Sequence, residues 1–197
     1  MSNRLGRKTI VYESNFRFKD ETFVVNSGEG KGIIKEILEK LIEQLQISYE
    51  IHRRLHVLRF DLHQENYSDD NQTISRFFNL MNQWLRRNYQ MKEVGYGWVR
   101  EQSKAKSQHY HCVYYLDGDK IRFPDRLIRK MKDVWVHGNV SYVKKPYFNI
   151  NHSNYETEMQ NAIYRISYLA KSKTKGYRKP QTKDYSFSRL VNSRKTI

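Results

Sequence analysis

The sequence is nearly free of cysteine and has no long apolar run. Cys112 is the single cysteine among 197 residues, which excludes an internal disulfide and a Cys-rich zinc site. No window approaches the roughly 18 apolar residues that a membrane span needs. Residues 1–9 are basic, but they lack the apolar stretch and small-residue cleavage site of a signal peptide. We therefore expect a protein of the reducing cytoplasm with no membrane partner.

Acidic residues are scarce relative to basic ones. The chain has 21 Asp and Glu against 36 Lys and Arg, which gives a formal net charge of +15. Such an excess attracts a polyanion, most often nucleic acid. Fifteen tyrosines and three tryptophans offer faces on which unpaired bases can stack. The charge is equally compatible with a protein that only coats RNA, as ribosomal proteins do.

Hydrophobic periodicity predicts one domain in which helices and strands are mixed. A chain of 197 residues is long enough to bury one ordinary core. Apolar residues at helical spacing predict helices, and alternation predicts strands, two of which form a hairpin. The expected helices cover residues 33–45, 73–85, 125–135 and 155–173, and the expected strands cover 9–12, 22–25, 56–62, 94–101, 109–116 and 140–143. This order indicates an α+β fold with helices packed on a mainly antiparallel sheet.

A His-x-His pair stands on the second strand of the expected hairpin. Side chains alternate along a strand, so His109 and His111 point to one face with Cα atoms about 6.6 Å apart. Glu101, at the end of the partner strand, is the best-placed carboxylate for a third ligand. Two imidazoles and a carboxylate suit a Lewis-acid ion, with Mg²⁺ or Mn²⁺ expected and zinc compatible by ligand type. Two histidines at this spacing also occur on strands by chance.

The last expected helix carries a stripe of tyrosines and lysines. At 100° per residue, two tyrosines and two lysines share one narrow sector, and the apolar residues fall on the opposite side. These four residues are Tyr164, Tyr168, Lys171 and Lys175. A tyrosine can act as a covalent nucleophile, and a nearby lysine or metal-bound group can help it to ionise. A solvent-facing stripe without a catalytic role gives the same pattern.

This stripe places a constraint on the fold. A helix cannot press its apolar side on the sheet and aim the opposite side at the same sheet. If Tyr168 approaches the two histidines, another element, such as the helix over residues 33–45, has to cover the apolar side of the last helix.

The His-Tyr-His strand followed by Tyr168-Leu-Ala-Lys171 resembles the HUH endonucleases of rolling-circle replication. These enzymes have a His-hydrophobic-His metal motif and a downstream Tyr-x-x-Lys motif on a helix. The resemblance covers roughly residues 55–175 and is closest to the replication initiators of filamentous phages and their integrated relatives, in which a strand like Trp98-Val-Arg-Glu101 precedes the histidines. Tyr110 in place of an aliphatic residue is a mild departure. The tyrosine follows the histidines here, whereas it precedes them in conjugative relaxases.

The resemblance implies a ferredoxin/RRM-like antiparallel sheet with helices packed on it, the HUH nuclease fold. It also implies site-specific, metal-dependent nicking and joining of single-stranded DNA. A divalent ion on the two histidines and Glu101 would polarise the scissile phosphate. Tyr168 is the implied nucleophile, leaving a 5′-phosphotyrosine link and a free 3′-OH, and Lys171 would steady the developing charge. Tyr164 would be an auxiliary or a second acceptor.

The resemblance further implies a division of the chain and a set of partners. Residues 1–32 form an N-terminal extension, 33–175 the nuclease domain and 176–197 a basic C-terminal tail. The expected partners are single-stranded DNA at a replication origin and a host helicase and polymerase, in the cytoplasm of a bacterial host cell, with no small-molecule substrate. The hairpin loop and the basic C-terminal region would grip DNA phosphates. The residues proposed for this contact are Lys104, Lys106, Lys173, Lys175, Arg178 and Lys179.

Three other interpretations are open. A non-catalytic module could bind DNA or RNA with the same basic, aromatic surface. An HUH transposase is a second alternative, although that type tends to pair its tyrosine with a glutamine, whereas Lys171 stands here. A metal-dependent oxygenase or cupin-like enzyme would use the His-x-His pair, but it generally needs a further histidine and often an acid just after the pair. The next acid is Asp117, at the end of the strand.

Overall fold

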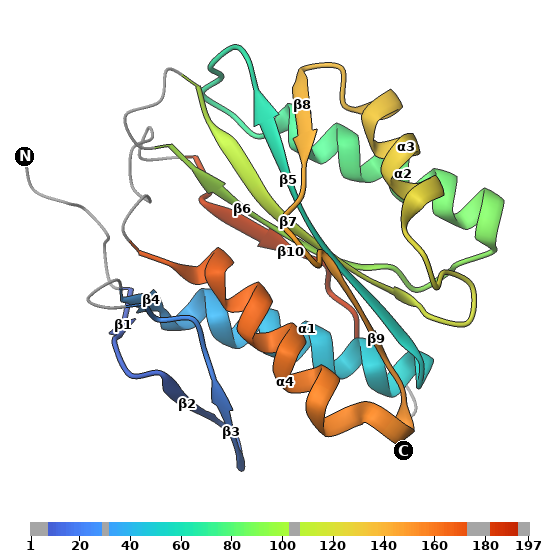
Figure 1. Ribbon diagram of the computed structural model, residues 1–197. Coiled ribbons are helices and arrows are strands. Elements are labelled where there is room, and N and C mark those ends of the chain that lie inside the picture. The colour runs from blue at the N-terminus through green and yellow to red at the C-terminus, as the bar shows by residue number, and fades with distance from the viewer. Residues whose placement is uncertain (1–7, 29–31, 103–106, 173–181, 193–197) are drawn as a thin grey trace, which may run out of the picture.

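A six-stranded sheet separates two helical layers in the computed structural model (Figure 1). The structure describes residues 8–28, 32–102, 107–172 and 182–192. The sheet order is β10-β6-β7-β5-β8, and β9 pairs with the same outer edge of β5 as β8, at the other end of that strand. The strands are β5 (Leu55–Gln64), β6 (Gly95–Glu101), β7 (His109–Asp117), β8 (Gly138–Ser141), β9 (Tyr147–Ile150) and β10 (Tyr185–Phe187). All their pairings are antiparallel, which confirms the α+β class with a mostly antiparallel sheet.

Helices α1 (Lys35–His52) and α4 (Tyr155–Ile166) cover one face of the sheet (Figure 1). Alternation along the strands points Val57 of β5 and Val113 of β7 to this side, where they share a buried cluster with Leu41 and Ile163. The apolar side of α4 is thus covered by α1 as well as by the sheet. Burial of this cluster fixes the two helices against the strands.

Helices α2 (Gln72–Tyr89) and α3 (Asp125–Val134) cover the opposite face. Phe60 and Tyr114 point to this side and stack on one another with ring centroids 5.6 Å apart, in a cluster that includes Phe77 of α2 and Met131 of α3. The described chain contains four α-helices, α1 to α4. Among the described residues, none is long and apolar enough to cross a membrane.

The N-terminal residues join the same core through short strands. They are β1 (Ile10–Val11), β2 (Asn15–Phe18), β3 (Glu21–Val24) and β4 (Ile33–Ile34). Phe16 and Phe23 are buried in the cluster of α1 and α4. Val24 and Gln160 of α4 exchange two hydrogen bonds, of 3.1 and 2.8 Å. The predicted extension at 1–32 therefore contributes to the core, and its boundary as a separate unit stays a prediction.

Several elements differ from the sequence-based expectation. The last helix, expected to reach residue 173, ends at Ile166 and continues as a 3-10 turn, η2 (Ser167–Ala170). A second 3-10 turn, η1 (His152–Asn154), leads into α4. β2, β9 and β10 were not expected, because strands of three or four residues carry too little periodicity to be recognised. β10 lies within the predicted tail at 176–197 and pairs with β6 at the sheet edge.

Gly138 at the start of β8 occupies a position that other residues fit poorly. Its φ is +153°, and a Cβ there would collide with the backbone oxygen of His63. We expect Gly138→Ala to lower the free energy of unfolding by about 1–3 kcal/mol. The measurement is urea unfolding, with the exposed neighbour Asn139→Ala as the control, for which we expect a change below about 0.5 kcal/mol. Equal effects of the two substitutions would contradict the steric explanation.

Candidate functional site

The α1/α4 face of the sheet changes from apolar to polar half-way along β5. Leu55 and Val57 are buried in the hydrophobic cluster, whereas Arg59, Asp61 and His63 continue the same face. Arg59 and Asp61 are 3% and 8% exposed, so two charged side chains are buried where a core would ordinarily be apolar. Buried charges persist only when they are paired. This half of the face is therefore a candidate site.

Three predicted ligands meet at this polar end. Pairing of β6 with β7 sets Glu101 directly opposite His109. The Oε2 atom of Glu101 lies 3.0 Å from Nε2 of His111 and 3.5 Å from Nε2 of His109. One ligand atom from each residue lies within 4.8 Å of the others. The geometry thus brings the two histidines and the carboxylate together as one cluster.

Asp61 orients His111 from the other side. Pairing of β5 with β7 sets Asp61 opposite His111, and its Oδ1 lies 2.5 Å from Nδ1 of the imidazole. Arg59 contributes a guanidinium nitrogen 3.3 Å from the same carboxylate oxygen. An imidazole that donates Nδ1–H to a carboxylate keeps Nε2 for a metal ion, and this partnership is frequent behind metal-ligating histidines. In the sequence, Arg59 and Asp61 could be recognised only as two charged residues on the same face of the strand as Val57.

The donor set fits a divalent ion. Burial lowers the pKa of His111, but hydrogen bonds to Asp61 and Glu101 outweigh it and leave the pKa above its ordinary value. When both ring nitrogens of His111 are protonated, the imidazole donates to both carboxylates. A bound ion would take the place of the proton between Nε2 and Glu101. Two imidazoles and a carboxylate are ligands that Mn²⁺ and zinc accept, with Mg²⁺ favouring the carboxylate. The residues present are therefore compatible with the predicted metal.

Tyr168 lies beside this cluster. Its ring centroid is 5.3 Å from that of His111, in an edge-to-face arrangement. The guanidinium carbon of Arg59 lies 5.0 Å from the Tyr168 ring centroid, and Nζ of Lys171 lies 4.3 Å from it. Both cations therefore lie within cation–π distance of the Tyr168 ring.

The end of α4 explains how Tyr168 reaches the sheet. Ser167 ties the helix end, since its hydroxyl donates to the carbonyl of Tyr164 and accepts from the backbone N–H of Asn26, both at 2.8 Å. The chain then follows the tighter 3-10 turn, and Lys171 adopts an extended conformation that bridges to Ile33. A uniform 100° rotation per residue therefore does not hold beyond residue 166.

The two tyrosines of the predicted stripe lie in different surroundings in the structure. Tyr164 precedes the change in the helix and is 46% exposed, in a hollow that it lines with Lys145, Phe148 and Arg165. Tyr168 is half-buried next to His111. The structure brings Tyr168 and Lys171 to the candidate metal ligands and leaves Tyr164 on the outer surface. Lys175 lies outside the described residues.

The six predicted DNA-binding residues also lie outside the described part of the chain. They are Lys104, Lys106, Lys173, Lys175, Arg178 and Lys179. Their contact with DNA stays a prediction.

Two further residues at the site carried no sequence prediction. His63 stacks on His109 with ring centroids 5.5 Å apart, and its Nε2 lies 2.9 Å from the hydroxyl of Ser141 on β8. Burial and the neighbouring His109 lower the pKa of His63. A neutral imidazole next to the cluster can accept or donate one hydrogen bond to a substrate.

Tyr110, the unusual middle residue of the His motif, belongs to the other face. Its side chain is fully buried, and its ring meets Trp98 edge-to-face at 5.7 Å. Its hydroxyl bonds to Asn71 and Gln108, at 3.4 and 3.5 Å. A tyrosine is accommodated here because the α2/α3 side offers polar partners for its hydroxyl.

We expect Asp61→Asn to weaken Mn²⁺ binding by about 10- to 100-fold, because the orienting carboxylate behind His111 is lost. Isothermal titration calorimetry measures the affinity. The control is Asp119→Asn, since the Asp119 side chain is 57% exposed and forms an ion pair with Arg54 at the surface. An Asp61→Asn protein that binds Mn²⁺ as tightly as the control would contradict this role.

Metal affinity should fall as the pH is lowered from about 8 to about 6. The pKa of His111 is raised, so its proton persists to higher pH than in an ordinary histidine and competes with the ion. Raising the pH removes this competitor. Calorimetry in two buffers of different ionisation enthalpy should show proton release on Mn²⁺ binding. Affinity that is constant over this pH range would contradict a ligand role for His111.

Comparison with known proteins identifies one family. The model of the family described as YagK/YfjJ C-terminal domain matches residues 18–187. No curated protein and no solved structure matches the chain. The matched range contains β5, β6, β7, α4 and η2, and therefore every residue of the candidate site.

Proposed function

We propose that this chain, which belongs to the YagK/YfjJ C-terminal domain family, is a metal-dependent endonuclease that nicks and joins single-stranded DNA through Tyr168. The family description states no activity, so the proposal rests on the site. Within this proposal the sheet is of the ferredoxin-like HUH type. Support comes from two histidines on a central antiparallel strand and a tyrosine above the same face.

The position of Tyr168 carries the proposal. The tyrosine and the histidines are separated by more than fifty residues, yet Tyr168 and His111 are in ring contact. A His-x-His pair that occurs by chance is not expected to lie next to Glu101 and the buried Asp61 as well as a tyrosine in contact with two cations. A nucleophile next to a Lewis-acid site is the arrangement that phosphoryl transfer needs.

His109, His111 and Glu101 would hold the divalent ion, with Mg²⁺ or Mn²⁺ proposed. When bound, the ion supplies Lewis-acid polarisation of a phosphate oxygen. Asp61 fixes the ring of His111 through its Nδ1 atom. Arg59 neutralises Asp61, which limits the negative charge that a phosphodiester meets at this site.

The proposed reaction exchanges one phosphoester for another. The hydroxyl oxygen of Tyr168 forms a bond to phosphorus, and the bond from phosphorus to the 3′ oxygen breaks. The phenol loses one proton and the leaving 3′ oxygen gains one, so charge and atoms balance. The DNA is left with a free 3′-OH and a 5′-phosphotyrosine link, which the reverse reaction rejoins. The Lys171 ammonium, beside the Tyr168 ring, stabilises the charge that develops on the phosphate.

The proposed biological setting is replication initiation of the rolling-circle type. The substrate would be single-stranded DNA at an origin in a bacterial cytoplasm, with a host helicase and polymerase as partners. The net charge of +15 supports a polyanionic substrate. The 3′-OH product is the end that a polymerase extends.

Tyr168→Phe should abolish a covalent protein–DNA product, because the ring is kept and the attacking oxygen is lost. The assay incubates protein with labelled single-stranded DNA and Mn²⁺, and a denaturing gel resolves the adduct. Tyr164→Phe is the matched control, since Tyr164 lies one helical turn away and is exposed. We expect Tyr164→Phe to retain the adduct. Chelator present from the start should prevent adduct formation by both the unsubstituted protein and Tyr164→Phe.

The opposite pattern, an adduct lost in Tyr164→Phe and kept in Tyr168→Phe, would move the nucleophile to Tyr164. Tight DNA binding without any adduct over diverse substrates would favour a non-catalytic nucleic-acid-binding module, which the basic charge also supports.

A further inference from the structure

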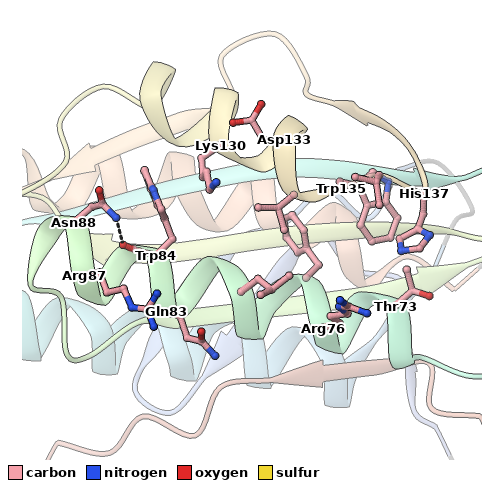
Figure 2. Close-up of a pocket in the computed structure, with 14 residues that line it drawn as sticks. Thr73, Arg76, Gln83, Trp84, Arg87, Asn88, Lys130, Asp133, Trp135 and His137 are labelled. Carbon is pink, nitrogen blue, oxygen red and sulfur yellow. Dashed lines mark hydrogen bonds between the residues drawn. The ribbon is translucent and has the colours of Figure 1, made fainter.

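A hollow of about 610 Å³ lies between α2 and α3, on the face of the sheet opposite the metal cluster. Figure 2 shows Trp84 and Arg87 toward one end of this α2–α3 groove, and Trp135 and His137 at the other. Arg76 extends from α2 and Lys130 from α3, on opposite sides. The groove plays no part in the chemistry proposed above, so its side chains need their own explanation.

The rim of the groove carries positive charge that the protein does not neutralise. Arg76 and Arg87 are exposed, and Lys130 is half-buried. In the described part of the chain, none of these three cations forms an ion pair or a hydrogen bond. The whole of α2 has no acidic residue, and Asp133 is the single acid that lines the groove. Unpaired cations gathered along a groove attract an extended polyanion.

The lining of the groove is partly apolar and aromatic. Leu80 and Val136 line it and are 42% and 76% exposed, which leaves apolar surface in contact with water. Trp84 also lines it, and the guanidinium of Arg126 lies 5.5 Å from the Trp84 ring centroid. Aromatic side chains beside a cationic rim suit unpaired nucleobases, whose rings stack while their phosphates meet the cations.

The groove is joined to the candidate active site at the end of β5. The indole Nε1 of Trp135 donates to the backbone oxygen of His63 at 2.9 Å, and the backbone N–H of Glu65 donates to the oxygen of His137 at 2.9 Å. The ring of His63 in turn stacks on His109. The His137 end of the groove therefore lies at the strand end where the metal cluster stands.

From this continuity we infer that the α2–α3 groove is a second nucleic-acid-binding site, which takes a single-stranded segment flanking the phosphodiester at the metal cluster. The location next to a cleaved phosphodiester rests on the proposed function, whereas nucleic-acid binding by the groove does not. The nucleic-acid strand would pass the end of β5, and its phosphates would contact Arg76, Arg87 and Lys130. An acidic protein segment would be drawn by the same charge, but the tryptophan favours bases.

The first experiment measures binding without cleavage. Fluorescence anisotropy with a labelled oligo-dT of about 30 nucleotides, in chelator, gives the affinity as a function of salt. We expect Arg76→Ala/Arg87→Ala to weaken binding roughly ten-fold or more at about 0.1 M salt. The slope of log affinity against log salt should fall by about 1.4, because two DNA phosphates no longer meet an arginine.

The control is Arg17→Ala/Lys40→Ala, which removes the same charge from exposed positions on β2 and α1. Its affinity should stay within about three-fold of the unsubstituted protein. Thermal unfolding checks that both variants fold. A second readout uses 5-iodouracil in the oligonucleotide, and we expect photocrosslinks at Trp84.

The outcomes separate the two proposals. If the unsubstituted protein forms the Tyr168 adduct but the groove variant binds DNA like the control, the groove inference is overturned and the groove belongs to another class of ligand, such as an acidic protein segment. If no adduct forms but the groove variant alone loses binding, the endonuclease proposal fails and the nucleic-acid site stands. Loss of affinity in both variants to the same extent would also overturn the groove inference.

Discussion

The hydrogen-bonded row from Asp61 through His111 to Glu101 depends on the register of three strands. The imidazole is 5% exposed and is held between two carboxylates, one from β5 and one from β6. Buried charges of this kind are tolerated because each has a partner, with Arg59 completing the group. A shift of one residue in either pairing would turn these side chains to the α2/α3 face. The position of β7 between β5 and β6 is therefore the constraint on which the candidate site depends.

The early end of α4 reconciles two demands on the last helix. Ile163 and Ile166 have to face the sheet and α1 to bury apolar surface. Tyr168 has to face the same sheet to reach His111. A regular helix cannot satisfy both, whereas a change to a 3-10 turn after residue 166 re-aims Tyr168 without uncovering the core. The hydroxyl of Ser167 stabilises this change through its two hydrogen bonds.

The two faces of the sheet carry different groups of side chains along β5 and β7. On one side, the polar half of the face brings the candidate metal ligands next to Tyr168. On the other, Tyr110 and Trp135 fill the core below the α2–α3 groove, with ring centroids 6.3 Å apart. The hydrogen bond from Trp135 to the backbone of His63 connects the sides at the sheet edge. A single strand of nucleic acid that passes this edge could contact both without any rearrangement of the sheet.

The sequence alone was sufficient for the elements with strong periodicity and for the shared face of His109 and His111. The α+β class followed from amphipathic helices and alternating strands, and the two histidines shared a face because side chains on a strand alternate. Glu101 was proposed as a third ligand from its place at the end of the partner strand, and the pairing of β6 with β7 sets it opposite His109. These predictions depend on residues that are close in the sequence, so they can be made from the sequence alone.

Contacts between distant segments needed the tertiary structure. Asp61 became a partner of His111 only when β5 paired with β7, and the charge on β5 had given it no assigned role. The separation of Tyr164 from Tyr168 depended on Ser167, whose bond to Asn26 joins segments 141 positions apart. The α2–α3 groove likewise exists only because two amphipathic helices pack side by side. The sequence thus determined which groups were present and which face of each element they shared, and long-range pairing and packing decided which of them meet.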